Sequence, residues 1–115
     1  MKGPYRLRQI NIDQYVSSKP GTYCLTYSAG DKNMACYVGR SDNDLNSRLK
    51  DHLPGNEIDP CIIRKSVDKF YFQETNSTRE AYDLECKWYH EYKPSCNNIH
   101  PDKTYLSWSC PVCGA

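Results

Sequence analysis

The fold is decided by residues 21–39, which read GTYCLTYSAGDKNMACYVG. After the opening glycine, Tyr23, Leu25 and Tyr27 alternate with smaller residues, which is the period-two pattern of a half-buried strand. A polar segment with a central glycine separates this run from Met34–Gly39, a second run that favours a strand. Because a short polar loop joins the two runs, the sequence predicts an antiparallel hairpin.

A third strand and a capped helix are predicted downstream of this hairpin. Residues 69–75 are rich in aromatic side chains at alternate positions, as in a strand. Ser77, followed three residues later by Glu80, has the capping-box form, and the helix that it begins should run for roughly four turns, until just before Pro94. Glu85 falls within the apolar stripe of this helix, which consists of Ala81, Leu84, Trp88 and Tyr92.

Two shorter helices and an N-terminal lead-in complete the predicted architecture. Leu45, Leu49 and Leu53 are spaced by four residues after Ser41 and Asp42, which offer N-cap oxygens. A short helix is expected around residues 61–64, and a short helix or extended arm in residues 1–19. The predicted fold is a small α/β (α+β) domain, with a three-stranded, largely antiparallel sheet flanked by helices.

Composition sets limits on the class of protein. The chain has 115 residues, of which 38% are hydrophobic and 25% charged, as in one ordinary globular domain. No apolar run approaches the roughly 20 residues of a membrane span, and no signal peptide is recognisable, so we expect a cytoplasmic protein without membrane contact. In that compartment the seven cysteines predict reduced thiols or metal ligands rather than disulfides.

Five features of the chain occur in an order that resembles the GIY-YIG nuclease superfamily. They are Gly21-Thr22-Tyr23, Tyr37-Val38-Gly39, Arg48 with His52, Glu85, and Asn97. The resemblance covers about residues 20–98, which we take as the nuclease domain, with residues 1–19 as its lead-in and residues 99–115 as a cysteine-rich tail.

The resemblance implies hydrolysis of DNA phosphodiester bonds with one Mg²⁺ or Mn²⁺ ion. Glu85 offers the hard oxygen ligand that Mg²⁺ prefers. Arg48 offers a planar fork that contacts the scissile phosphate, and His52 lies four residues further on, on the same helical face. Tyr23 and Tyr37 are the candidate general bases for the attacking water, and we favour Tyr23.

Three more residues of the resembled pattern are assigned supporting roles. Gly39 and Arg40 are expected to contribute to substrate binding, the latter by adding positive charge to the pocket. Asn97 is expected to fix local geometry through side-chain hydrogen bonds, with Asn98 as its competitor.

The tail carries the pattern Cys110-Pro-Val-Cys113-Gly, which is typical of a zinc knuckle. Cys96 and His100 are the nearest further ligands, and Cys86 with His90 on the capped helix is the alternative pair. Cys24, Cys36 and Cys61 are interpreted as small core residues. We therefore predict a structural Zn²⁺ bound by Cys96, His100, Cys110 and Cys113.

The predicted function is that of a metal-dependent DNA endonuclease. The formal net charge of +1 implies that DNA binding depends on a few local cations and on the metal. A homodimer and a separate targeting protein both remain open. The competing hypotheses are a non-catalytic nucleic-acid-binding module on the same fold and a zinc-stabilised interaction module.

Overall fold

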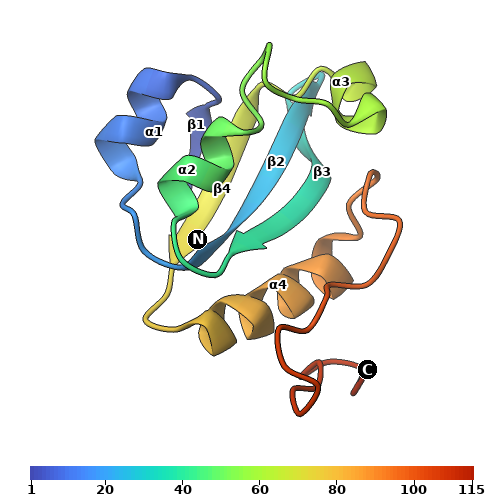
Figure 1. The fold of residues 1–115 in the computed structure, drawn as a ribbon. Helices are drawn as coiled ribbons and strands as arrows, with labels where there is room; N and C mark the ends of the chain where they lie inside the picture. The colour runs from blue at the N-terminus through green and yellow to red at the C-terminus, as the bar shows by residue number, and fades with distance from the viewer.

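A computed structural model of residues 1–115 shows one four-stranded sheet surrounded by four helices (Figure 1). The elements in chain order are β1 (Lys2–Arg6), α1 (Gln9–Tyr15), β2 (Gly21–Ala29), β3 (Lys32–Ser41), α2 (Leu45–Lys50), α3 (Pro60–Lys65), β4 (Lys69–Glu74) and α4 (Thr78–Tyr92). The sheet order is β1-β4-β2-β3, and every neighbouring pair is antiparallel. None of the helices has the length and apolar character needed to cross a membrane.

The predicted hairpin of β2 and β3 forms the centre and one edge of the sheet. Tyr23 pairs with Gly39, and Gly21 pairs with Ser41. The opposite edge of β2 pairs with β4, so that Tyr23 also lies beside Phe72. Strand β2 is therefore enclosed on both sides, which explains why its first six residues are all buried.

The prediction of three strands was one short, because the N-terminal lead-in supplies β1. This strand pairs with β4 at the edge of the sheet, where Tyr5 lies opposite Phe70. Of its five residues only Tyr5 is partly buried, so the segment lacks the alternation by which buried strands are recognised in a sequence. Helix α1 follows directly, and the lead-in thus contributes both elements that the sequence left open.

The two faces of the sheet are covered by different helices. The face that carries Tyr23, Leu25 and the phenylalanines of β4 packs in one core with residues of α1, α2 and α3. On the other face, Cys24 and Val38 pack against Trp88 of α4. Thr22 also faces α4, where its hydroxyl donates to the Ala81 carbonyl oxygen. Figure 1 shows the C-terminal tail running past α4 after that helix ends.

Three of the four helices, α2, α3 and α4, begin at a side chain that caps them. Asp44, rather than Ser41 or Asp42, caps α2 by accepting from the backbone N–H of Ser47. Ser77 caps α4 by accepting from the N–H of Glu80, as the capping box predicts. Helix α3 confirms the short helix expected around residues 61–64 and is capped by Asp59, which precedes a proline at the first helical position.

After α4 the chain returns along the free edge of β3. The N–H of Ser95 donates to the Ala35 carbonyl, and the N–H of Cys96 donates to the Cys36 carbonyl. This return places Cys96 beside Cys61 of α3, and the two form a disulfide with a Cα–Cα distance of 5.7 Å.

The disulfide corrects three sequence predictions, the first being that the cysteines are reduced thiols or metal ligands and form no disulfide. Cys61 is not a free core thiol, and Cys96 cannot be a zinc ligand because its sulfur is bonded to that of Cys61. The two cysteines are 35 residues apart, a separation that matches no recognisable spacing motif. Their pairing follows from the path of the chain after α4, which the sequence does not reveal.

We predict that denatured, chelator-treated protein takes up five alkyl groups per chain without reductant, because five of the seven cysteines are free thiols. Prior reduction should raise the number to seven, as measured by intact mass. In a Cys61→Ala variant all six remaining cysteines should react with or without reductant. Seven alkyl groups on unreduced wild-type protein would contradict the disulfide.

Candidate active site

Most of the predicted site residues line one cavity of about 470 Å³ at the free edge of β3. These residues are Tyr37, Gly39, Arg40, Arg48, Glu85 and Asn97. The cavity draws on both faces of the sheet, because Tyr37 packs against the core of α1, α2 and α3, whereas Glu85 belongs to α4. An edge strand is the place where residues from two opposite faces can meet around the sheet.

Glu85 is the buried carboxylate of the cavity. Its Oε1 accepts from Arg40 Nη1 at 2.5 Å, and the residue is only 8% exposed. Burial raises the pKa of Glu85, and the hydrogen bond and charge of Arg40 oppose that rise. Oε2 accepts no hydrogen bond from the protein, and it is not fully buried. Because Glu85 lines the cavity, this oxygen is open to it.

Arg40 is fixed by three partners at once. Besides Glu85, its Nε donates to Asp42 Oδ1 at 2.8 Å and its Nη2 donates to Thr104 Oγ1 at 3.0 Å. The guanidinium also lies over the ring of Tyr82, 5.2 Å from the ring centre. Arg40 was predicted to bind substrate, whereas the structure commits its donor nitrogens to groups of the protein itself.

A buried chain of hydrogen bonds joins Tyr23, His52 and Glu57. His52 Nδ1 lies 2.6 Å from Glu57 Oε1, and His52 Nε2 lies 2.7 Å from the Tyr23 hydroxyl. An ionised carboxylate only accepts, so Nδ1 carries the ring proton, and in the neutral ring Nε2 accepts from the tyrosine. His52 lies beyond the end of α2, so the helix does not hold it. The hydrogen bonds to Tyr23 and Glu57 fix its ring.

Glu57 is the member of this chain that sequence reasoning missed. It lies five residues after His52 in an irregular loop, where no periodicity links the two side chains. An acidic residue close to a candidate histidine was the only available signal.

The two candidate bases differ in their access to the cavity. Tyr23 is fully buried and does not line the cavity, and its burial raises its pKa far above the ordinary value. Tyr37 lines the cavity beside Arg48. Burial raises the pKa of Tyr37 too, and the positive charge of Arg48 opposes the rise at both tyrosines, so access to the cavity is what separates them. The geometry therefore favours Tyr37, against the preference for Tyr23 drawn from the sequence.

Arg48 projects from α2 into the same cavity and also borders the neighbouring space beside His52. Its side chain is 43% exposed, and its one ion pair is with Asp51, which is 62% exposed, at 3.2 Å. Exposed ion pairs of this kind contribute about 0–1 kcal/mol. Arg48 is therefore free to exchange Asp51 for an anionic ligand at little cost.

Gly39 is required where β3 passes the two tyrosines. A Cβ built on Gly39 would lie 2.6 Å from Tyr23 Cζ and 2.9 Å from Tyr37 Cε2, closer than side-chain carbons approach one another. Gly39 thus supports the site by its lack of a side chain, and the backbone lines the cavity directly.

Asn97 binds the backbone of β3 as a further strand would. Its Oδ1 accepts from the N–H of Val38 at 2.8 Å, and its Nδ2 donates to the carbonyl of Val38 at 2.9 Å. The expected side-chain hydrogen bonds are therefore present, and they hold the strand between Tyr37 and Gly39. Asn98 also lines the cavity but has no such bonds.

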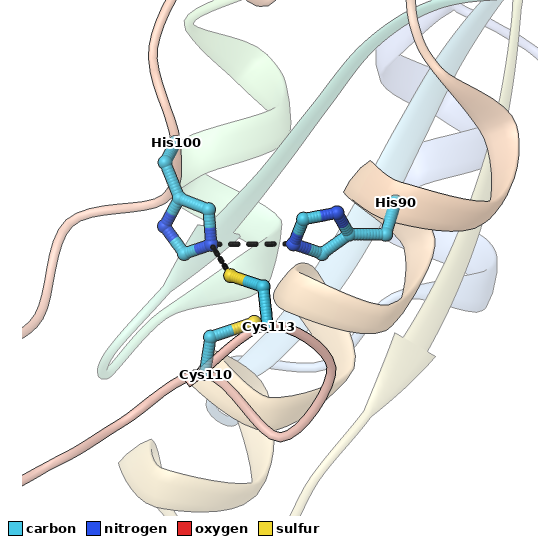
Figure 2. A group of neighbouring side chains, drawn as sticks. All are labelled: His90, His100, Cys110 and Cys113. Carbon is cyan, nitrogen blue, oxygen red and sulfur yellow. Dashed lines mark hydrogen bonds between the residues drawn. The ribbon is translucent and has the colours of Figure 1, made fainter. Parts of the chain in front are cut away.

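A second group of chemically reactive side chains lies where the tail meets α4 (Figure 2). His90 comes from α4, and His100, Cys110 and Cys113 come from the tail. Each offers a ligand atom within 4.8 Å of the others. Compared with the predicted set, His90 takes the place of Cys96. Of the alternative pair, His90 belongs to the group and Cys86 does not.

The Cys110 thiol is suited to metal binding by its surroundings. Burial acts to raise the pKa of the Cys110 thiol. The backbone N–H groups of Cys113 and Val112 outweigh this effect and lower the pKa of Cys110 to about 6. The N–H of Val112 donates to Cys110 Sγ at 3.4 Å. Because the thiolate is the form that binds metals, this turn prepares Cys110 as a ligand.

Comparison with known proteins agrees with this arrangement. The GIY-YIG catalytic domain family matches residues 19–99, and the chain therefore belongs to that family. The Thermotoga maritima UvrC GIY-YIG N-terminal endonuclease domain, solved with its catalytic magnesium ion, is 22% identical, with a TM-score of 0.58. The match covers 76% of this chain and 96% of that domain.

A tyrosine-to-phenylalanine variant of the same UvrC domain gives a TM-score of 0.60 at 21% identity, over 77% of this chain and 97% of the other. These likenesses show that the fold is shared. A comparison with curated proteins found no match.

We predict that Gly39→Ala lowers the free energy of unfolding by about 1–3 kcal/mol, because the new methyl group displaces the tyrosine rings. Urea unfolding followed by tyrosine and tryptophan fluorescence measures the change. Lys32→Ala, at an exposed position of the same strand, is the matched control and should stay within about 0.5 kcal/mol of wild type. Equal stability of Gly39→Ala and wild type would refute the close packing.

Proposed function

We propose that the protein is a Mg²⁺-dependent endonuclease that hydrolyses DNA phosphodiester bonds in the cavity at the edge of β3. The observation that carries this proposal is the placement of Glu85, whose Oε2 is open to the same cavity as Arg48 and Tyr37. A metal ligand, a phosphate-binding cation and a proton acceptor are the groups that hydrolysis of a phosphodiester requires. Membership of the GIY-YIG family supports the same function.

The charge of the cavity fits a divalent cation. Its walls carry two arginines, Arg40 and Arg48, and four carboxylates, which belong to Asp42, Asp59, Glu85 and Asp102. Carboxylate oxygens are the ligands that Mg²⁺ and Mn²⁺ prefer. A phosphate would be repelled by this excess of negative charge unless a cation balanced it. When bound at Glu85, the metal ion would supply positive charge to the phosphate and its leaving oxygen.

Arg48 and Tyr37 are assigned the two other tasks. Arg48 exchanges its exposed partner Asp51 for a nonbridging oxygen of the scissile phosphate and remains charged throughout. In its phenolate form, Tyr37 accepts the proton of the attacking water at its phenolic oxygen and becomes a neutral tyrosine. Burial raises the pKa of Tyr37, so the phenolate is scarce at neutral pH, and the rate of cleavage should increase as the pH is raised.

The Tyr23–His52–Glu57 chain is assigned a positioning role. It fixes His52 against Tyr37, and the centres of these two rings are 5.6 Å apart. The chain of hydrogen bonds therefore holds one side of the cavity. The competing assignment makes Tyr23 the base, with His52 taking its proton. Full burial of the Tyr23 ring argues against direct contact with the attacking water.

Two metals belong to the proposal. Mg²⁺, or Mn²⁺ in its place, acts at Glu85, and Zn²⁺ binds the His/Cys group of the tail as a structural ion. The alternative function is a non-catalytic nucleic-acid-binding or zinc-stabilised interaction module, and the Arg40–Glu85 ion pair is the observation that favours it. In such a module Arg40 would neutralise Glu85 permanently, and no divalent ion would be needed.

We predict that Glu85→Gln lowers the rate of plasmid nicking in Mg²⁺ by at least about 100-fold. A neutral amide oxygen binds Mg²⁺ more weakly than a carboxylate oxygen and forms no ion pair with Arg40. Glu91→Gln, at an exposed position of the same helix, is the control and should cut like wild type. Salt-sensitive DNA binding by wild type without cleavage in any divalent metal would favour the non-catalytic module.

We predict that Tyr37→Phe reduces the rate of cleavage by about 100-fold or more, since general bases contribute on that scale. Tyr23→Phe, which removes the hydrogen bond to His52, should cost less activity and leave the rise of the rate with pH in place. Single-turnover cleavage over a range of pH separates the two variants. A larger loss in Tyr23→Phe, together with a flat pH profile, would make Tyr23 the base.

A further inference from the structure

We propose that zinc bound by His90, His100, Cys110 and Cys113 fastens the tail as a wall of the catalytic cavity, and that Thr104, which follows this wall in the tail, is a positioning residue for Arg40 and Glu85. The inference rests on the proposed nuclease function. It extends that function by linking the metal site of the tail to the metal site of the cavity through contacts of this chain.

The ligand set has the composition of a structural zinc site. Two thiolates and two imidazoles are a common set for tetrahedral Zn²⁺. His90 Nε2 lies 3.3 Å from His100 Nε2, and Cys113 Sγ lies 3.5 Å from the same His100 atom (Figure 2). Figure 2 shows the four side chains pointing toward one centre from α4 and from two parts of the tail.

The tail has few other attachments that could hold it. Residues 102–107 are all exposed and form no helix or strand. Beyond the four ligands and the hydrogen bonds of Thr104, the main contact is Trp108. Its ring packs 5.4 Å from that of Tyr82 and lies beneath the guanidinium of Arg79. A segment with so little buried apolar surface needs a further restraint, and a metal that joins both ends of the loop between His100 and Cys110 supplies it.

The same tail forms part of the catalytic cavity. Residues 98–102 line it, and His100 is both a cavity residue and a zinc ligand. The two metal sites therefore share a wall. A displacement of His100 on zinc loss would change the cavity directly.

Thr104 connects the tail to the ion pair at Glu85. Its Oγ1 accepts from Arg40 Nη2 at 3.0 Å and donates to Asp42 Oδ2 at 2.9 Å. Because Arg40 Nε also donates to Asp42, these three residues form a closed ring of hydrogen bonds. This ring of hydrogen bonds fixes the plane of the guanidinium. Nη1 therefore donates to Glu85 Oε1, and Oε2 is left open to the cavity.

Zinc content tests the ligand set. Wild-type protein should retain about one zinc per chain after dialysis, and Cys113→Ser should retain less than half an equivalent. Cys86→Ala is the matched control, because Cys86 lies beside Cys110 but outside the ligand set, and it should keep its zinc. Wild-type protein without zinc, or loss of zinc in Cys86→Ala alone, would overturn the ligand set.

Binding of Mn²⁺ to the zinc-loaded protein, measured by calorimetry, tests the role of Thr104. Thr104→Val should weaken Mn²⁺ binding about threefold to tenfold, the scale of one hydrogen bond, while zinc content stays unchanged. Thr104→Ser keeps the hydroxyl and should restore wild-type affinity. Cys113→Ser should weaken Mn²⁺ binding at least as much, and adding Thr104→Val to it should cause no further loss.

Wild-type Mn²⁺ affinity in Thr104→Val, or equal losses in the Val and Ser variants, would overturn the positioning role. A different result would reject the proposed nuclease function. If wild type binds Mn²⁺ with the expected pattern across these variants but never cuts DNA, the linkage between the two sites holds and the proposed function is rejected.

Discussion

The buried ion pair between Arg40 and Glu85 is the interaction on which the rest of the site depends. Burying two charges is costly, and the cost is offset only where geometry and further hydrogen bonds are good. Asp42 and Thr104 provide those bonds to the guanidinium, and the ring of Tyr82 covers its face. The pair thereby joins β3 to α4, and the hydrogen bond from Arg40 to Thr104 adds the tail.

The position of the cavity follows from the position of β3 at the edge of the sheet. Side chains alternate between faces along this strand, so Tyr37 and Arg40 begin on opposite sides. At an interior strand they would be separated by the sheet. At the edge both reach the same space, and Asn97 covers the exposed backbone between them. Gly39 lets the strand pass close to Tyr23.

Local patterns in the sequence predicted the hairpin, the third strand and α4, because alternation and capping act between residues close in the chain. The family pattern likewise identified six of the 14 residues that line the cavity. What the sequence did not predict depends on long-range contacts. Strand β1 is an exposed edge, and Glu57 lies in an irregular loop. Cys96 meets Cys61, and His90 meets the tail, only through the path of the chain after α4.

In the proposed function, Glu85 binds the catalytic ion through the oxygen that Arg40 leaves free. Anomalous diffraction from crystals grown with Mn²⁺ would locate this ion. We expect one manganese peak in the cavity beside Glu85, with the Arg40 ion pair retained, and no such peak in crystals of Glu85→Gln. An intact ion pair with no manganese in the cavity at saturating Mn²⁺ would contradict the claim.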